Sequence, residues 1–92
     1  MTTNVFRDNK DLGRFELEVA GHTAFADYRR AEGKLVIDHV EAPIPLRGAG
    51  AAGELMGRLA AEARREGLKI VPICGYAATW LRRHPEFSDL VA

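Results

Sequence analysis

The stretch that decides the fold is R-G-A-G-A-A-G, at residues 47–53. It follows an apolar run that ends near Ala42 and precedes a long helical pattern that begins near Ala51, so it joins a strand to a helix. Gly48 and Gly50 allow a tight turn, and the first turn of the helix exposes unpaired N–H groups at the positive end of its dipole. Such a junction is suited to binding a phosphate group. The same small residues are also typical of a sharp corner that only lets the helix pack closely.

This loop resembles the coenzyme A loop of the GNAT acetyltransferase superfamily, whose pattern is Arg or Gln, two residues, Gly, one residue, then Gly or Ala. Arg47, Gly50 and Ala52 meet that pattern. A P-loop for nucleoside triphosphates is not supported, because no Gly-Lys-Ser or Gly-Lys-Thr closes the stretch. The resemblance implies that the pyrophosphate of acetyl-CoA binds to the backbone of Arg47, Gly48, Ala49, Gly50, Ala51 and Ala52.

The length of 92 residues suits one small domain, which we expect to span residues 1–92. Thirteen basic side chains balance thirteen acidic ones, and this balance disfavours nucleic acid as a partner. No apolar run approaches the roughly 20 residues that span a bilayer, and the polar N-terminus lacks the apolar core of a signal peptide, so no membrane association is expected. The single cysteine fits a cytoplasmic location. The three histidines are dispersed and predict no metal site.

The first half of the chain predicts antiparallel strands. Residues 15–19 alternate apolar and polar side chains, which is the period of a strand with one buried face. A turn at residues 20–22 leads into a second alternating run at residues 23–29, and the two runs predict a hairpin. A further turn leads to a third, more apolar strand at residues 35–41. Residues 1–13 are a polar lead-in with a strand fragment around Val5 and Phe6.

The second half of the chain predicts a strand-helix-strand crossover. Pro43 and Pro45 end the strand before the loop. Gly67 lies where a left-handed cap would end the helix, and a last strand covers residues 68–74. Because such crossovers are right-handed and join parallel strands, residues 35–41 and 68–74 should be parallel neighbours. One apolar stripe of the helix comprises Ala52, Leu55, Met56, Leu59, Ala60 and Ala63.

Pro72 predicts that the two parallel strands separate near their C-terminal ends, because proline has no N–H to give to a central ladder. A gap at this place, beside a phosphate-binding helix, suits an extended ligand arm. The alternative is that Pro72 only marks an edge strand. A short helix at residues 76–83 follows, and the apolar residues of the tail close over the core.

Residues 15–91 as a whole resemble the very small, single-domain branch of the GNAT superfamily. The shared features are the hairpin turn at Gly21, His39-Val40-Glu41, a proline before Arg47-Gly48-Ala49-Gly50, Pro72-Ile73-Cys74 and His84-Pro85-Glu86-Phe87. The resemblance implies an α/β fold with a mixed sheet, in which antiparallel N-terminal strands precede a crossover with splayed parallel strands and a C-terminal helix. It also implies that acetyl-CoA is the acyl donor and that its pantetheine arm lies in the splay.

His39 and Glu41 are the candidate general bases. Strand alternation places them on the same face, at the end where the gap opens. A histidine or a partly buried carboxylate can take a proton from an amine directly or through water. The backbone N–H of Val40 is the natural donor to the thioester oxygen. The alternative is a half-buried histidine beside a solvated glutamate, and a bulge in this strand would alter the alternation.

GNAT enzymes carry a tyrosine, on the helix after the last core strand, that protonates the departing CoA thiolate. The comparable position here is Trp80, whose indole N–H has no useful acidity. Tyr76, one turn earlier, is the candidate substitute, or it is simply a packed aromatic residue. The pairs Arg64-Arg65 and Arg82-Arg83 are typical of solvated helix surfaces, although one of them could reach the 3′-phosphate of CoA.

Cys74 ends the predicted last strand and should lie across the gap from His39 and Glu41. As a nucleophile it would take the acetyl group from CoA and pass it on, with His39 favouring the thiolate. As a small apolar residue it would only pack in the interior. Direct transfer is the default mechanism, and transfer through Cys74 is the alternative.

The resemblance, together with these residues, implies an acetyl-CoA-dependent N-acetyltransferase that acts on an amine of a small molecule or a protein. The alternative is a non-catalytic module that binds acyl-CoA or a protein partner and keeps the pocket, which the small size and the missing tyrosine favour. A thiol redox sensor built on Cys74 is a third possibility, and it predicts no affinity for CoA. The sequence leaves the oligomeric state open.

Overall fold

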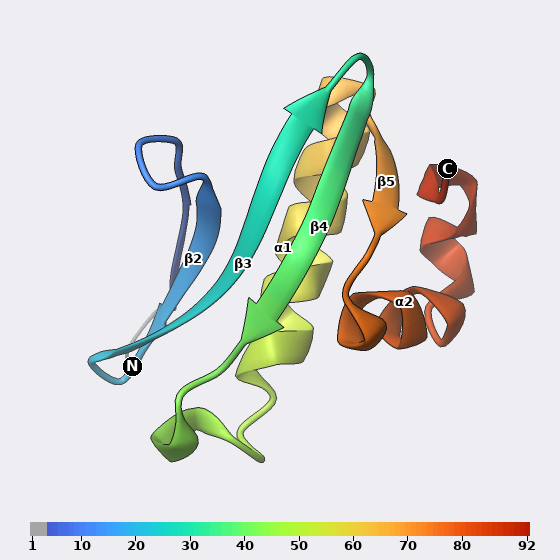
Figure 1. Ribbon diagram of the computed structural model, residues 1–92. Helices are drawn as coiled ribbons and strands as arrows, with labels where there is room; N and C mark the ends of the chain where they lie inside the picture. Colours follow the sequence, from blue (N-terminus) through green and yellow to red (C-terminus); the bar gives the residue numbers. More distant parts are fainter. Residues whose placement is uncertain (1–3) are drawn as a thin grey trace.

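The computed structural model describes residues 4–92, so the first three residues of the predicted lead-in lie outside the described part. Its strands are β1 (Val5–Asn9), β2 (Arg14–Val19), β3 (His22–Ala31), β4 (Lys34–Glu41) and β5 (Lys69–Pro72), its helices are α1 (Ala51–Glu66) and α2 (Gly75–Arg82), and its 3-10 helices are η1 (Ile44–Leu46) and η2 (Pro85–Leu90). The strands form one mixed sheet in the order β1-β2-β3-β4-β5. Helix α1 lies behind this sheet, and no helix of residues 4–92 covers the front of β2, β3 and β4 (Figure 1). The predicted α/β class is confirmed.

Antiparallel pairs build the N-terminal part of the sheet. The turn between β2 and β3 passes through Ala20, with φ 51°, and Gly21, with φ 79°. Both lie in the left-handed region that a tight hairpin turn requires. The predicted hairpin is therefore confirmed. The fragment predicted around Val5 and Phe6 is a complete strand that pairs along β2.

The core lies between α1 and the back of the sheet. Leu55, Met56 and Leu59 are fully buried on the helix, because spacings of three and four residues place them on one face. Burying each such side chain stabilises the fold by about 1.5–3 kcal/mol. The predicted stripe is correct except at its start, where Ala51 is buried and Ala52 is half-buried. The fully buried strand residues of the same apolar cluster include Phe15, Leu17, Leu35 and Ile37.

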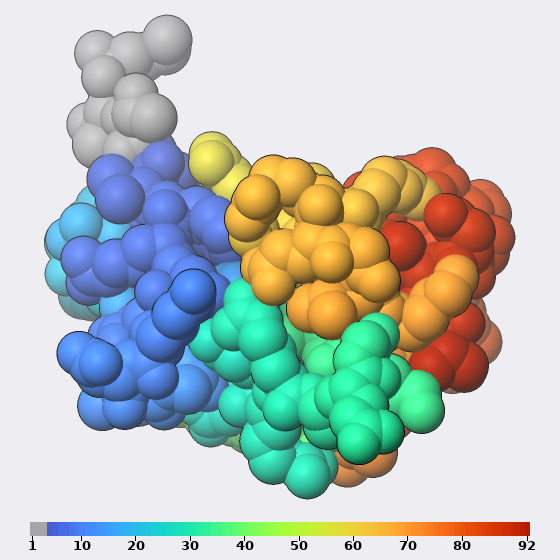
Figure 2. All heavy atoms as spheres, turned by 90° about the horizontal axis from the view of Figure 1, so that it is seen from above, coloured from blue at the N-terminus to red at the C-terminus, as the bar shows by residue number. Residues whose placement is uncertain are grey.

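At the end of the molecule away from the loop, hydrogen bonds connect the β3–β4 turn, the start of β5 and the C-terminus. Gly67, with φ 73°, caps α1 in the left-handed conformation as predicted. The N–H of Lys69 then donates to the carbonyl of Gly33 in the β3–β4 turn over 2.9 Å, and the N–H of Ala92 donates to Ile70 over 2.9 Å. Figure 2 looks onto this end and shows the last turn of α1 beside both the β3–β4 turn and the C-terminal segment.

Strands β4 and β5 form the predicted parallel pair, but over only part of β4. The last pair of the ladder is Ile37 with Pro72. Beyond it, the N–H groups of Ile73 and Cys74 both donate to the Ile37 carbonyl, over 3.0 and 3.1 Å, and β4 continues without β5 beside it. The predicted separation at Pro72 is confirmed. The prediction that the strand covers residues 68–74 is wrong at its end, because Cys74 is the N-cap of α2 and not a strand residue.

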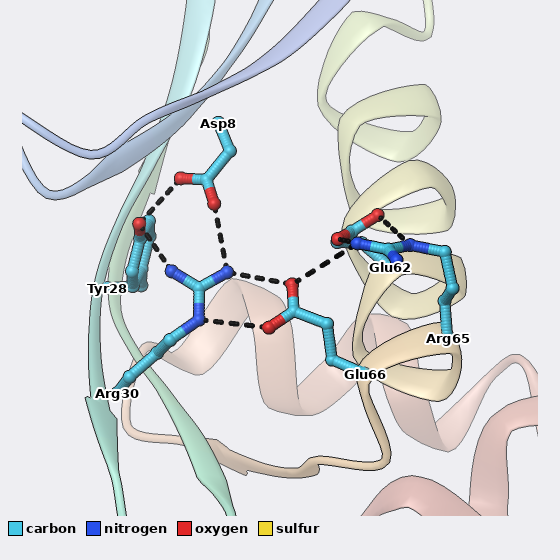
Figure 3. A network of polar contacts seen from close by, with 6 residues as sticks. All are labelled: Asp8, Tyr28, Arg30, Glu62, Arg65 and Glu66. Atoms are coloured by element: carbon cyan, nitrogen blue, oxygen red, sulfur yellow. Dashed lines mark hydrogen bonds and ion pairs between the residues drawn. The ribbon is translucent and has the colours of Figure 1, made fainter.

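A polar network joins β1, β3 and the last turn of α1 (Figure 3). Arg30 donates to Asp8 over 2.9 Å and to Glu66 over 2.8 Å. The hydroxyl of Tyr28 donates to Asp8 over 2.5 Å, and burial together with this bond raises the pKa of Tyr28. The side chains of Arg30, Asp8 and Glu66 are 29%, 18% and 24% exposed, so water screens these contacts only in part.

Replacing Arg30 by methionine leaves Asp8 and Glu66 without their shared cation. We expect a loss of about 2 kcal/mol in the free energy of unfolding, between the range of about 0.2–1 kcal/mol for exposed pairs and about 3–5 kcal/mol for buried ones. Urea unfolding at neutral pH measures the loss. Arg58→Met is the matched control, since Arg58 pairs with Glu54 on the exposed side of α1 and contributes less than about 0.5 kcal/mol. Equal losses in the two variants would contradict the role of the network.

Candidate functional site

The loop between β4 and α1 is fixed by its own contacts. Leu46 of η1 is buried, and its carbonyl accepts the N–H of Ala49 over 3.1 Å. Gly48 and Gly50 have φ values of 83° and 79°, in the left-handed region that favours glycine. These turns let α1 begin directly after the loop.

Several backbone N–H groups at the start of α1 have no acceptor. Within residues 4–92, those of Gly50, Ala51, Ala52 and Gly53 donate no hydrogen bond, and the first bond of the helix runs from Glu54 to the Gly50 carbonyl over 3.0 Å. They border a cavity of about 350 Å³. Clustered donors at the positive end of a helix fit a diphosphate. The cavity is lined by Ala42, Leu46, Arg47, Gly48, Gly50, Ala51, Ala52, Gly53 and Tyr76.

The loop residues selected from the sequence fall into two groups. Arg47, Gly48, Gly50, Ala51 and Ala52 line the cavity. Ala49 does not, and its N–H is already used within the loop, so it has no donor left for a ligand. Gly53 lines the cavity but was not among the predicted residues, although an isolated glycine inside a helical pattern was the available signal.

Two other features of this region can be separated from the cavity. Gly48, Gly50 and Gly53 have the spacing of the G-x-G-x-x-G dinucleotide fingerprint, but that fingerprint follows its strand directly, whereas η1 intervenes here. Arg64 donates to Asp89 over 2.6 Å at the far end of α1, about 20 Å from the loop at the rise of a helix. The pair at residues 64–65 is therefore remote from the cavity.

Tyr76 and Trp80 of α2 lie beside the start of α1. A Cβ atom on Gly53 would come within 3.7 Å of Trp80 Nε1 and 4.0 Å of Tyr76 Oη, so both polar atoms face this glycine. Tyr76 lines the cavity and is 43% exposed, whereas Trp80 is buried and stacks on His84 with ring centroids 3.7 Å apart. Partial burial raises the pKa of Tyr76. Tyr76 therefore presents a protonated phenol hydroxyl at the cavity.

A bulge in β4 directly precedes His39. The register with β3 skips Asp38, which is an extra residue on β4. Regular alternation from the buried Ile37 would turn His39 and Glu41 into the core, but the bulge places them on the front face, where His39 Nε2 lies 3.0 Å from Glu41 Oε1. Two hydrogen bonds of 2.8 Å from Arg29 fix Asp38 and lower the pKa of its carboxyl. The two candidate bases share a face as predicted, because the bulge precedes both.

The same bulge turns Val40 toward the back of the sheet. Val40 packs against the core, on the face that also holds Ile37. In a strand, the face taken by a side chain also fixes the edge to which its backbone N–H and C=O point. The Ile37 carbonyl points to the β5 side. The N–H of Val40 therefore points into the gap that β5 leaves.

Cys74 lies at the other side of this gap. Its N–H donates to the Ile37 carbonyl over 3.1 Å, and its side chain is partly buried against the core. His39 and Glu41 lie on the front face instead, and within residues 4–92 no hydrogen bond joins either of them to the Cys74 thiol. The pairing of Cys74 with His39 as its base stays a prediction.

Comparison with known families decides the identity of the fold. The sequence model of the GCN5-related N-acetyl-transferase family matches residues 14–90. The chain belongs to this GNAT family of acetyltransferases. Among the proteins with curated descriptions, none matches the chain.

A solved structure has a similar fold. The solution NMR structure of a GCN5-like protein from Staphylococcus aureus superimposes with a TM-score of 0.71, covering 100% of this chain and 91% of that chain at 21% sequence identity. The predicted GNAT-like fold is therefore confirmed.

Among residues 4–92, no three His, Cys, Asp or Glu side chains gather as a metal site. No helix in the same range has the length and apolar character needed to cross a membrane.

Tyr76 should ionise above its ordinary pKa of 10, because burial disfavours the phenolate. The chain has two tyrosines, so in a Tyr28→Phe variant Tyr76 is the remaining one. In this variant, the tyrosinate absorbance measured as the pH is raised gives the pKa of Tyr76. The unfolded chain ionises first, so stability should also fall as the pH rises through 10. A blocked tyrosine amide is the reference. Ionisation of Tyr76 at or below the pH of this reference would contradict its placement.

Proposed function

We propose that this GNAT protein binds acetyl-CoA and transfers the acetyl group directly to an amine. The proposal rests on two features that lie next to each other. One is the group of unbonded N–H groups at the start of α1, and the other is the edge of β4, which has no partner strand beyond Ile37. The first supports binding of the pyrophosphate, and the second supports pairing with the extended pantetheine arm. Arg47 lines the same cavity and adds a cation for the phosphates.

The transfer breaks one C–S and one N–H bond and forms one C–N and one S–H bond. The neutral amine nitrogen attacks the thioester carbon, a C–N bond forms, and the C–S bond breaks so that CoA leaves as a thiolate. His39 and Glu41 receive the proton of the amine, directly or through water, and Tyr76 supplies the proton that turns the thiolate into a thiol. Tyr76 then regains a proton from water, and the His39-Glu41 pair releases the proton that it received to water. The N–H of Val40 donates to the thioester oxygen as it gains charge, and such a donor contributes about 10²-fold or more to the rate.

A non-catalytic module that binds acyl-CoA is a second candidate, and Trp80 favours it. Trp80 takes the place of the tyrosine that other GNAT enzymes use as the acid, and an indole N–H does not protonate a thiolate. Both candidates bind CoA. Only the enzyme releases CoA thiol from acetyl-CoA at a rate that depends on the supplied amine.

Gly50→Ala should weaken CoA binding at least tenfold. A side chain at φ 79° is strained, and relief of this strain turns the N–H groups of the loop away from the cavity. Gly21→Ala is the matched control, because Gly21 has the same φ of 79° in the β2–β3 turn. Both variants should lose about 1–2 kcal/mol of stability, but calorimetric titration should show weaker CoA binding in Gly50→Ala alone. Unchanged affinity in Gly50→Ala would argue against the loop as the phosphate site.

Direct transfer predicts different effects at Cys74 and Glu41. Cys74→Ser should keep kcat within about threefold, whereas Glu41→Gln should lower kcat by about 10²-fold through loss of the proton acceptor. Thiol release in the presence of an amine measures both rates. Rapid quenching followed by mass spectrometry provides the second test. Acetyl on Cys74 during turnover, together with an inactive Cys74→Ser variant, would establish the covalent route instead.

A further inference from the structure

We infer that the indole N–H of Trp80 binds the sulfur of CoA beside the start of α1. Trp80 acts as a hydrogen-bond donor that keeps its own proton, and the sulfur occupies the space that Gly53 leaves open. The inference rests on the proposed binding of acetyl-CoA, because the sulfur belongs to that ligand. It adds to the proposed site a residue that stabilises the departing thiolate.

The indole N–H of Trp80 has no acceptor within residues 4–92. The side chain is only 9% exposed, and a polar group buried to this extent usually has a partner. The N–H is not fully enclosed either. In the described part of the chain, Arg14 Nε is the one fully buried side-chain nitrogen or oxygen that lacks a hydrogen bond. The Trp80 donor is therefore unpaired and still accessible to an acceptor on a ligand.

The space next to this donor is the side-chain position of Gly53, in the first turn of α1. A Cβ atom at that position would lie 3.7 Å from Trp80 Nε1 and 4.0 Å from Tyr76 Oη. Both distances are ordinary van der Waals contacts, so the packing of α2 against α1 does not require a glycine here. The missing side chain leaves room for a ligand atom beside both donors. Because Gly53 also lines the cavity, this room adjoins the proposed CoA site.

The contacts of the indole ring fix the direction of its N–H. The ring stacks on His84 with an interplanar angle of 13°, and the centroid of Phe87 lies 5.7 Å away. His84 Nδ1 also lies 2.7 Å from the Trp80 carbonyl oxygen, which ties the stacked ring to the backbone of α2. A donor that is oriented before the reaction needs no reorganisation when charge develops on its acceptor.

The surroundings of this donor favour sulfur over a further phosphate oxygen. The diphosphate already has Arg47 and the backbone N–H groups of the helix start, whereas Trp80 and Tyr76 are neutral donors on aromatic rings. Aromatic surroundings suit a large, polarisable atom better than a strongly hydrated phosphate. In the proposed transfer, Tyr76 gives its proton to the sulfur. Since Trp80 Nε1 faces the same point as Tyr76 Oη, a sulfur that meets the phenol also meets the indole N–H.

Trp80 interacts with the electron pair that the sulfur receives. As the amine nitrogen forms the C–N bond, the C–S bond breaks and its electron pair stays on the sulfur. The resulting thiolate accepts a hydrogen bond from Trp80 Nε1, and such charge-assisted bonds are about twice as strong as neutral ones. Trp80 gives up no proton, because an indole N–H is a donor without useful acidity. The S–H bond forms with the proton of Tyr76.

Binding of CoA and of desulfo-CoA, in which hydrogen replaces the thiol group, tests the contact without turnover. The chain has one tryptophan, so an isotope-labelled sample gives one indole N–H signal in an NMR spectrum. Near pH 8, where a thiol with a pKa of about 8.5 is partly ionised, saturating CoA should move the indole proton downfield, and desulfo-CoA should not. Calorimetric titration should show about fivefold tighter binding of CoA. An indole signal that responds alike to both ligands, or equal affinities for the two, would overturn the inference.

Two glycine variants of α1 form a matched pair. Gly53→Ala puts a methyl group in the space beside the two donors, so the preference for CoA over desulfo-CoA should vanish and kcat should fall about tenfold. Gly57→Ala adds the same methyl group one turn later, where its Cβ would lie 3.9 Å from Cζ2 of the same indole ring, and should leave the preference and kcat unchanged. Both variants should fold, because alanine is a better helix former than glycine. Equal effects of the two variants would overturn the inference.

Trp80→Phe removes the N–H and keeps an aromatic ring beside His84. This variant should bind CoA and desulfo-CoA equally, and its kcat should fall about tenfold. Benzothienylalanine at residue 80 is the control for packing, because its ring has the shape of indole with sulfur in place of the N–H. It should reproduce the loss of preference at the thermal stability of the wild-type protein. A preference for CoA that survives in both variants would overturn the inference.

The two proposals fail in different ways. If neither CoA nor desulfo-CoA binds, the acetyl-CoA proposal is wrong and the inference falls with it. If both bind equally and Trp80→Phe turns over acetyl-CoA at the wild-type rate, the transfer proposal stands and the role of Trp80 is wrong.

Discussion

The end of the β4–β5 ladder at Pro72 is the constraint on which the site depends. Proline has no N–H to continue a parallel ladder, and the next two N–H groups, of Ile73 and Cys74, both turn to the Ile37 carbonyl. One carbonyl thus ends the pairing and lets the chain leave the sheet for α2. The remainder of β4 keeps an edge without a partner strand. Backbone groups on such an edge need water or a ligand as hydrogen-bond partners, so the sheet itself provides a place for an extended molecule.

A single extra residue decides which side chains meet that place from each face. Asp38 interrupts the alternation of β4, so the core-facing series passes from Ile37 to Val40, and His39 and Glu41 come to the front. Two hydrogen bonds from Arg29 to the Asp38 carboxylate stabilise the bulge. Backbone donors and the helix terminus thereby lie toward the back, and groups that can accept a proton lie toward the front. In the transfer that we propose, this arrangement would let the donor and the amine approach β4 from opposite faces.

Most of the fold could be predicted because its signals are local. The alternation at residues 15–19 and the apolar stripe of α1 depend only on the spacing of neighbouring residues, and Gly67 marks a helix end by its backbone preference. The end of β5 could not be predicted as well. Residues 68–74 remain mostly apolar past Pro72, although the pairing stops there. Apolar character reports burial, and burial continues after the ladder has ended.

The site was predictable only in part, because it depends on relations between segments. Ala49 and Ala52 are both alanines, but the fold of the loop gives their N–H groups different surroundings. The N–H of Ala49 donates to Leu46, whereas that of Ala52 is left beside the cavity. The bulge at Asp38 is a property of the register between two strands, so the sequence around His39 does not reveal it.

The front of the sheet carries a buried charge that explains how this face can remain without a helical cover. Glu16 lies in the middle of it and is only 7% exposed. Its carboxylate accepts hydrogen bonds from Arg7 Nε over 2.7 Å and from Asn9 Nδ2 over 3.3 Å, both on the adjacent strand. Partners within the sheet therefore satisfy this charge, and a helix packed on top would have to desolvate them. Apolar burial is concentrated on the back instead, against α1. A domain of this size has little burial to lose, and placing His39 and Glu41 off the packed face allows them to be polar and half exposed without weakening the core.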